Sequence, residues 1–499
     1  MTTAAHHHRP VRLLAVASGG LILILALAAA ASPSSTRGAA AGAPAAAGAR
    51  VAAPGGTWGT AQQVPGTAAL NKGGSAQVTS VSCAKAGDCS AGGHYTDASR
   101  RTQAFVAGEA NGIWGPAEEI PGTAALNKGG SAEITSVSCA KAGDCSAGGF
   151  YRDASGHFQA FVAGEARGVW GKAQQVPGTA ALNKGGSAGI FSVSCAKAGD
   201  CSAGGFYRDP SGHSQAFVAG EARGVWGKAQ QVPGTAALNK GGHAEIFSVS
   251  CARAGSCSAG GTYLDASGNT QVFVAGEAKG IWGHAQQVPG TAALNKGGDA
   301  EIFSVLCARA GSCSAGGFYT DAFGRPHAFV AGEAKGIWGH AEEVPGTSKG
   351  GGAAIRSVSC ASAGHCSAGG SYLDASGNAQ AFVAGEAKGI WSQAQQVPGI
   401  AALNKGGDAE ITSVSCARAG NCSVGGSYQE ASFHLQAFVA GEAKGVWGNA
   451  EEVPGIAALN KGGDAEITSV SCAQAGHCSA GGFYKDASRH LQAFVVNET

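Results

Sequence analysis

The stretch ITSVSCAKAGDCSAGGFYRDASGHFQAFVAGEARGVWGKAQQVPG, residues 134–178, contains the structural unit of this protein. Short segments rich in Val, Phe, Tyr and Trp alternate with Gly, Asp and Ser turn signals, which predicts four strands. The turns Lys-Ala-Gly-Asp, Asp-Ala-Ser-Gly and Ala-Arg-Gly are short enough to join antiparallel neighbours. The predicted strands are Ile134–Ala140, Cys145–Tyr151, Gln159–Ala166 and Val169–Val176.

This unit recurs along almost the whole chain. One Trp marks each copy, at positions 58, 114, 170, 226, 282, 338, 391 and 447. The interval is 56 residues except for one of 53, where the usual PGTAALNKGG is shortened to PGTSKGG (Pro345–Gly351). Because surface loops tolerate deletions, the ALNKGG segment is predicted to be a loop. One small sheet cannot bury both of its faces, so neighbouring sheets must stack.

The two ends of the repeat region indicate a closed ring. The region begins in a fourth strand, at Thr57-Trp58, and ends in a third strand, at Phe494–Thr499. In a ring, the strand Trp58–Val64 completes the last blade and leaves no edge strand exposed, whereas an open solenoid gains nothing from this arrangement. We therefore predict an all-β fold: an eight-bladed β-propeller of four-stranded antiparallel blades over residues 57–499, closed by pairing the N-terminal strand with the last blade.

The repeat also resembles a known family. Gly148-Gly149, the nearby Tyr151 and the downstream Trp170 form a pattern that is similar to the kelch-type propeller blade, and it is present in all eight units. The chain further resembles exported tandem-repeat proteins of actinobacterial type. It departs from kelch blades in its cysteine pair and its few large apolar residues. The resemblance implies the ring fold and no single activity, since propellers include enzymes and binding proteins.

Every cysteine belongs to a C-x5-C pair that spans the turn between the first and second predicted strands. Residues facing each other across a hairpin are within disulfide reach, whereas zinc sites usually show closer pairs with further Cys or His ligands. We predict eight local disulfides, no metal site and no cofactor. The pairs are Cys83–Cys89, Cys139–Cys145, Cys195–Cys201, Cys251–Cys257, Cys307–Cys313, Cys360–Cys366, Cys416–Cys422 and Cys472–Cys478.

The N-terminal region predicts export. Arg9 and Arg12 precede an apolar run that ends in a small-residue zone near Ala29–Ala31, which is typical of a signal peptide over residues 1–31. An uncleaved anchor helix over Leu13–Ala31 is the alternative. Residues 32–56 are rich in Ala, Gly, Pro and Ser and are predicted to be a flexible linker. Sixteen paired cysteines fit a secreted or cell-surface protein.

Composition excludes several other classes. The chain has 34 basic and 33 acidic side chains and a net charge of +1, which argues against a nucleic-acid binder and a polybasic membrane-surface protein. Its 83 glycines disfavour long helices, and 44% hydrophobic residues disfavour disorder. We expect a monomer without a nucleic-acid partner, and without membrane contact beyond the export signal.

Two loops are expected to share one face of the ring and to display polar side chains once per blade. The blade-to-blade loop contains Asn-Lys-Gly-Gly, and the turn between the second and third strands begins with Asp. The alternative interpretation is that Asp caps its own turn and Lys keeps the loop soluble. The candidate ligand-binding residues are Asn127, Lys128, Asp153, Asn183, Lys184, Asp209, Asn239, Lys240, Asp265, Asn295, Lys296, Asp321, Asp374, Asn404, Lys405, Asn460, Lys461 and Asp486. Near the opposite face, Glu165 and its equivalents are expected to form surface pairs of little energetic weight with cations such as Arg167.

Near-identical blades offer no unique constellation of nucleophile and base, so no catalytic residue is predicted. The favoured function is multivalent binding of an extracellular ligand, such as a cell-wall polysaccharide or a protein. The alternative is a structural or interaction scaffold at the cell surface. A propeller enzyme, a glycosidase or lyase, is the third hypothesis. A pocket between blades that holds a solvent-exposed aromatic residue beside Asp or Asn would favour glycan binding, and burial of all aromatic residues would weaken it.

Overall fold

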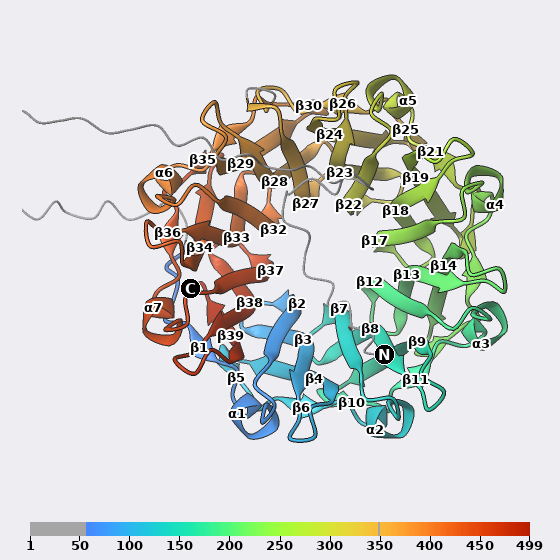
Figure 1. The fold of residues 1–499 in the computed structure, drawn as a ribbon, viewed down its shortest axis with the longest axis horizontal. Helices are drawn as coiled ribbons and strands as arrows, with labels where there is room; N and C mark the ends of the chain where they lie inside the picture. Colours follow the sequence, from blue (N-terminus) through green and yellow to red (C-terminus); the bar gives the residue numbers. More distant parts are fainter. Residues whose placement is uncertain (1–55, 348–349) are drawn as a thin grey trace, which may run out of the picture. The chain divides into compact units, whose positions relative to one another are not determined.

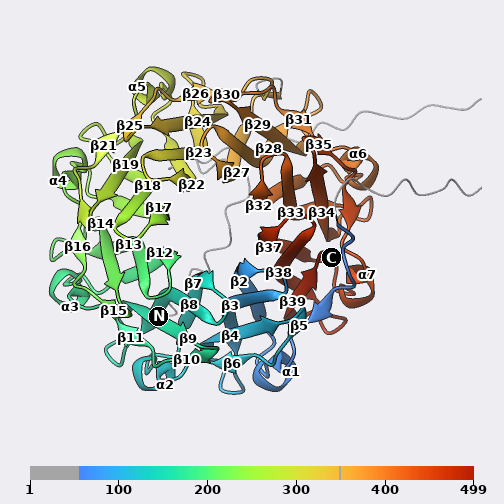
Figure 2. The same cartoon turned by 180° about the vertical axis from the view of Figure 1, so that it is seen from behind.

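Eight sheets surround a common axis in the computed structural model, which describes residues 56–347 and 350–499 (Figure 1). The predicted signal peptide and all of the predicted linker except Gly56 lie outside the described residues. The first strand of each sheet is the innermost and the second lies beside it (Figure 2). The innermost strands are β2 (Ala76–Lys85), β7 (Ala132–Lys141), β12 (Ala188–Lys197), β17 (Ala244–Arg253), β22 (Ala300–Arg309), β27 (Ala353–Ser362), β32 (Ala409–Arg418) and β37 (Ala465–Gln474).

The second and third strands form the middle of each blade. The second strands are β3 (Asp88–Thr96), β8 (Asp144–Arg152), β13 (Asp200–Arg208), β18 (Ser256–Leu264), β23 (Ser312–Thr320), β28 (His365–Leu373), β33 (Asn421–Gln429) and β38 (His477–Lys485). The third strands are β4 (Thr102–Ala110), β9 (Phe158–Ala166), β14 (Ser214–Ala222), β19 (Thr270–Ala278), β24 (Pro326–Ala334), β29 (Ala379–Ala387), β34 (Leu435–Ala443) and β39 (Leu491–Asn497).

The fourth strand, predicted as one segment, is split in two in blades 1–7. Both halves pair with the third strand, but between them the N–H of Ala173 donates to the carbonyl of Pro121 in the preceding blade, 2.7 Å away. The halves are β5 (Ile113–Trp114) and β6 (Glu118–Glu119), β10 (Val169–Trp170) and β11 (Gln174–Gln175), β15 (Val225–Trp226) and β16 (Gln230–Gln231), β20 (Ile281–Trp282) and β21 (Gln286–Gln287), β25 (Ile337–Trp338) and β26 (Glu342–Glu343), β30 (Ile390–Trp391) and β31 (Gln395–Gln396), and β35 (Val446–Trp447) and β36 (Glu451–Glu452).

The blade-to-blade connection, predicted as a loop, contains one helical turn. Gly122 adopts a left-handed conformation before Thr123, whose hydroxyl donates to the Ile120 carbonyl and fixes the start of the turn. Each helix in the described residues has four residues, so none is long and apolar enough to span a membrane. The helices are α1 (Thr67–Leu70), α2 (Thr123–Leu126), α3 (Thr179–Leu182), α4 (Thr235–Leu238), α5 (Thr291–Leu294), α6 (Ile400–Leu403) and α7 (Ile456–Leu459).

The ring is closed as predicted. Strand β1 (Gln62–Gln63) pairs with β39 and completes blade 8, while Trp58 forms a bridge with Glu498. The innermost strand β2 packs beside both β7 and β37. The fold is therefore an all-β, eight-bladed β-propeller.

The hydrophobic core consists of clusters that lie between blades. The Trp of each fourth strand and the Phe of each third strand are buried there. They pack with the Ile or Val side chains of the innermost strand of the same blade and with Ala or Val side chains from the third strand of the preceding blade. The Gly-Gly pair permits this packing, because a Cβ on Gly148 would come within 2.7 Å of Val193 in the next blade.

Serines also join neighbouring innermost strands. The N–H groups of Val137 and Cys139 donate to the hydroxyls of Ser80 and Ser82 in the preceding blade, at 3.0 and 2.9 Å. The Ser-Val-Ser-Cys sequence thus supplies hydrogen bonds where it supplies little apolar area.

Candidate functional site

The two loops predicted to share a face do so. The N–H of Gly129, in a blade-to-blade connection, donates to the carbonyl of Arg152 beside the turn between β8 and β9, and the N–H of Thr102 in the preceding blade donates to Gly130. We call this the Asn–Asp face. The opposite surface, formed by the turns between first and second strands and between third and fourth strands, is called the disulfide face.

The candidate asparagines are buried. Asn127 donates from Nδ2 to the Thr102 carbonyl and to Gln103 Oε1, both at 2.9 Å, and its Oδ1 accepts from the N–H of Ser131 at 2.7 Å. The equivalent asparagines are buried in the same way, so their amides connect adjacent blades. That they bind a ligand stays a prediction.

The candidate aspartates cap their own turns. Asp153 Oδ1 accepts from the N–H groups of Ser155 and His157, and Oδ2 accepts from Gln159. Partial burial opposes ionisation of Asp153, but these hydrogen bonds outweigh it and hold its pKa below the ordinary value. The carboxylates of the turns therefore remain charged at neutral pH.

The candidate lysines are exposed on the same face. Lys240 donates to the Ala236 carbonyl at the start of its short helix, and Lys296, Lys405 and Lys461 make the corresponding bond. One cation and one carboxylate per blade are thus displayed at regular intervals around most of the ring.

The glutamates expected to form surface pairs are instead half-buried or buried between blades. Glu165 Oε2 accepts from Ser90 of the preceding blade at 3.3 Å. Burial raises the pKa of Glu165 above its ordinary value, although the Ser90 hydroxyl acts in the opposite direction. The expectation of a solvent-exposed pair with Arg167 was wrong, because Ser90 and Glu165 lie 75 residues apart and meet only where blades stack.

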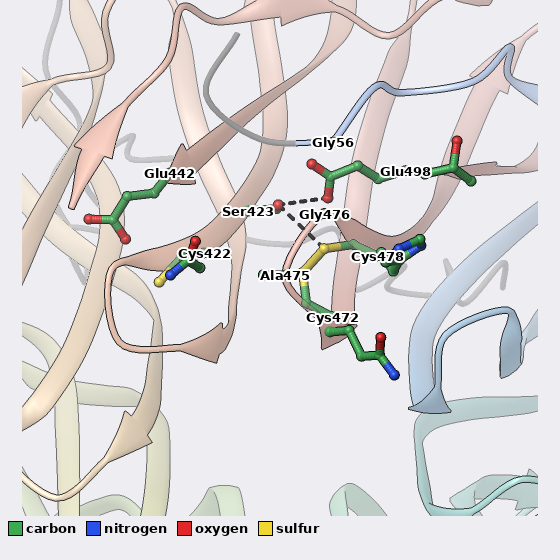
Figure 3. A pocket seen from close by; sticks show the side chains of 13 residues that line it. Gly56, Cys422, Ser423, Glu442, Cys472, Ala475, Gly476, Cys478 and Glu498 are labelled. Carbon is green, nitrogen blue, oxygen red and sulfur yellow. Dashed lines mark hydrogen bonds between the residues drawn. A yellow bond between two sulfur atoms is a disulfide. The ribbon is translucent and has the colours of Figure 1, made fainter. Parts of the chain in front are cut away.

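A cavity of about 330 Å³ lies at one of these junctions, between blades 7 and 8 (Figure 3). Ser423 donates to Glu498 at 3.0 Å, and its oxygen lies 3.4 Å from the Sγ of Cys478. At the preceding junction Glu442 Oε2 is buried without a hydrogen-bond partner.

All eight predicted disulfides are present, and no described cysteine is free. They indicate an oxidising, extracellular location. Four of the pairs have a glutamate oxygen within 4.8 Å, but a disulfide lacks the thiolate that binds metals.

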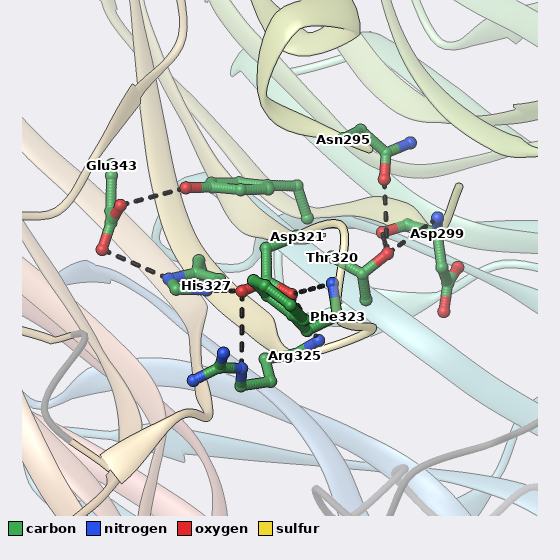
Figure 4. Close-up of polar contacts among 9 residues, drawn as sticks. Asn295, Asp299, Thr320, Asp321, Phe323, Arg325, His327 and Glu343 are labelled. Atoms are coloured by element: carbon green, nitrogen blue, oxygen red, sulfur yellow. Dashed lines mark hydrogen bonds and ion pairs between the residues drawn. The ribbon is translucent and has the colours of Figure 1, made fainter. Parts of the chain in front are cut away.

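The regular aromatic residues are buried, whereas two irregular ones are exposed on the Asn–Asp face. Phe323 is 80% exposed and Phe433 72% exposed. The Phe323 N–H donates to Asp321, and the Arg325 guanidinium lies over the Phe323 ring at 4.8 Å (Figure 4). Phe433 has a φ of 64° at a position that is Gly156 in blade 2, so this turn holds an aromatic side chain in a conformation that favours glycine.

In the turn of blade 5, a histidine replaces the glutamine that bonds to the turn aspartate in other described blades. His327 stands where blade 2 has Gln159 and lies 3.2 Å from Asp321 Oδ2 and 3.3 Å from Glu343 Oε1. Tyr319 donates to Glu343 and stacks on the imidazole ring, with centroids 5.3 Å apart. These contacts lie at the base of the turn that displays Phe323.

Sequence reasoning missed a group on the innermost strands of blades 3–6. Phe191 stacks on Phe247 with centroids 5.6 Å apart, and the Arg356 guanidinium lies 4.9 Å from the centre of the Phe303 ring. The corresponding position in blade 2 is Thr135. Variation at this position among otherwise similar repeats was the available signal.

Two carboxylates near this group have strongly shifted pKa values. Burial, with the nearby Glu301, raises the pKa of Glu245 to about 7. Burial, with the nearby Asp299, raises the pKa of Glu301 to about 7, although Arg356 opposes the shift. Between the ordinary value and pH 7, the unfolded chain therefore ionises these groups while the folded protein keeps them protonated.

Stability is accordingly expected to fall as pH rises from about 4.5 to about 7. At pH 8, Glu245→Gln/Glu301→Gln should raise the free energy of unfolding by roughly 2–3 kcal/mol per site, and at pH 4 it should change little. Denaturant unfolding at both pH values measures this. The exposed Glu118→Gln is the control, and equal gains at both pH values would contradict the assignment.

No family model and no curated protein matches this chain. Solved structures resemble this chain only distantly. They include the BP39L lectin from Burkholderia pseudomallei (12% identity, TM-score 0.40, 76% of this chain and 99% of that chain). YCF48 from Cyanidioschyzon merolae has 10% identity and a TM-score of 0.39, and the match covers 88% of this chain and 99% of that chain. An ulvan lyase, a polysaccharide lyase, has 9% identity and a TM-score of 0.40, and the match covers 90% of this chain and 96% of that chain. The sheet order and the pairing of β1 with β39 confirm the predicted ring fold, while the kelch-type family stays a prediction.

Proposed function

We propose that this protein is an exported, non-catalytic propeller that binds a repetitive extracellular ligand, such as a cell-wall polysaccharide, through the Asn–Asp face. The observation that carries the proposal is the exposed Phe323 beside the Asp321 carboxylate. An aromatic ring can cover the apolar face of a sugar while a neighbouring carboxylate accepts from its hydroxyls. Phe433 beside Glu430 offers a second pair in blade 7.

The repeated lysines and aspartates support multivalency. Each blade offers a shallow polar surface of weak affinity, and a ligand that repeats along its length can occupy several blades at once. The second candidate, a structural scaffold, is favoured by the buried amides of Asn127 and its equivalents, which serve contacts between blades.

The test measures binding to a glycan array and to cell-wall fractions. Phe323→Ser/Phe433→Ser is expected to weaken binding of a short oligosaccharide by roughly tenfold, because two stacking surfaces are lost. A second variant changes four lysines to serine, as Lys128→Ser/Lys184→Ser/Lys240→Ser/Lys296→Ser. It should weaken binding to the polymer by orders of magnitude, and binding to the short oligosaccharide only in proportion to the sites lost.

The matched control is Ile113→Ser/Ile281→Ser, which removes equally exposed apolar side chains from the disulfide face. A single-blade lysine variant that abolished polymer binding would indicate one asymmetric site and favour a unique partner or an enzyme. Failure to bind any glycan or wall fraction would favour the scaffold.

A further inference from the structure

The turn between the third strand and the split fourth strand displays a basic and an aliphatic side chain on the disulfide face. The aliphatic residues, each directly before a buried Trp, are 62–74% exposed. We call these turns the turn ring. Its members are Asn111 and Ile113, Arg167 and Val169, Arg223 and Val225, Lys279 and Ile281, Lys335 and Ile337, Lys388 and Ile390, and Lys444 and Val446.

The turn's own stability does not explain the basic residue. Arg167 has a φ of 53° and the following Gly168 a φ of 79°, a pair of positive values that is typical of a type I′ hairpin turn. Such turns favour Asn before Gly, as at Asn111-Gly112, because a longer side chain is disfavoured in the left-handed region. The other six turns hold Arg or Lys there at a cost in backbone energy, which points to a use for the charge.

The exposed turns of this face are mainly basic. Arg253, Arg309 and Arg418 are exposed in the turns between the first and second strands. In blades 1–3 the corresponding lysines pair with an aspartate three residues on, at 3.1–3.5 Å. The carboxylates of Glu165 and its equivalents lie deeper, between the blades. Exposed acids on the fourth strand occur in blades 1, 5 and 7, as Glu118, Glu342 and Glu451.

We propose that the disulfide face docks on an anionic lipid surface through the turn ring. Aliphatic side chains enter the boundary of the acyl chains while neighbouring cations contact acidic headgroups, the combination found in interfacial membrane binding. A hydrophilic polyanion would use the cations but leave the Ile and Val side chains without an apolar contact. A second copy of the chain would bring two basic rings together. Because the closed ring repeats the turn at equivalent positions, a flat surface can contact several of them at once.

The first described residue lies on the same face. Gly56 lies beside Gly476, in the turn between β37 and β38, on the disulfide face. Under the alternative of a retained anchor over Leu13–Ala31, only the Ala/Gly/Pro/Ser-rich segment from Ser32 would separate that anchor from Gly56 in the sequence. Docking through this face leaves the Asn–Asp face open to its own ligand, so the inference goes beyond the proposed function. It also differs from the expectation that a net charge of +1 argues against membrane-surface binding, because a chain with balanced total charge can still have one basic face.

The experiment measures co-sedimentation of the purified protein with phosphatidylcholine vesicles that contain one-third phosphatidylglycerol. Two variants change the turn ring in blades 2, 3, 4 and 6. One removes its cations and the other removes its aliphatic side chains. The first is Arg167→Asn/Arg223→Asn/Lys279→Asn/Lys388→Asn, and the second is Val169→Ser/Val225→Ser/Ile281→Ser/Ile390→Ser. Each is expected to lower the apparent partition coefficient roughly tenfold or more. The Asn variant should keep or raise the melting temperature, because Asn suits the turn, and so its lost binding cannot come from unfolding.

The matched control removes the same charge from the other face, as Lys128→Asn/Lys184→Asn/Lys240→Asn/Lys296→Asn, and should bind vesicles like the original protein. Equal binding to pure phosphatidylcholine, or equal loss in the control, would overturn the proposal. Binding to soluble polyphosphate but not to vesicles would assign the ring to an anionic polymer. A dimer in sedimentation equilibrium that the Ser variant dissociates would assign it to a second copy. If the original protein binds the vesicles but no glycan or wall fraction, only the proposed function is refuted.

Discussion

Deletion of residues 56–65 is expected to open the ring at blade 8 and to raise amide exchange in β39 by orders of magnitude. Strand β39 would lose its only outer partner, including the bonds from Gly59 to Asn497 and from Val64 to Ala493. Trp58 and Ala61 would also leave the core cluster they share with Val439 of blade 7. The edge strand exposed in this way has no other partner in the described ring.

Hydrogen–deuterium exchange followed by mass spectrometry measures this effect, with blades 3–5 as the internal reference. Trp58→Ala and Trp282→Ala form the matched pair. Both remove a buried indole at a cost of about 3–5 kcal/mol, but only the first lies at the closure. We expect Trp58→Ala to raise exchange in β39 and β1, and Trp282→Ala to raise it locally in blade 4. Unchanged protection of β39 after the deletion would contradict closure by the N-terminal strand.

Reduction of the eight disulfides is expected to have the second large effect. Each closes a hairpin of seven residues, and in the chain-entropy model one such link stabilises by about 2.4 kcal/mol. The second cysteine of each pair is also 4–5% exposed and belongs to a core cluster between blades. Because the eight links are repeated around one ring, their loss should lower the melting temperature far more than the loss of any one.

Calorimetry with and without reductant measures the total effect. The variant Cys251→Ser/Cys257→Ser in a central blade measures one link, and we expect it to reduce the free energy of unfolding by about 2 kcal/mol. Peptide mapping without reductant should recover each C-x5-C pair linked within itself. A melting temperature that is the same with all disulfides reduced would show that the stacked blades are sufficient without them.

Much of this fold is determined by short-range patterns in the sequence. The number of blades follows from the recurring Trp, and the hairpins follow from turns whose Gly and Asp residues fit tight reversals. The disulfides follow because Cys139 and Cys145 stand on either side of one such turn. Closure of the ring follows from the mismatch between the first and last strands. Each of these features depends on residues that are near in sequence or related by the period.

Other features were decided by contacts between blades. The fourth strand is split because Ala173 bonds to Pro121 of the preceding blade, and Glu165 is buried because Ser90 of another blade faces it. Asn127 was a ligand candidate by its residue type, yet the stacked blades bury its amide. The aromatic and basic side chains Phe191, Phe303 and Arg356 meet their partners across blades as well. Residues about one period or more apart become neighbours only when the ring forms, and their exposure, hydrogen bonds and pKa values are set at that point.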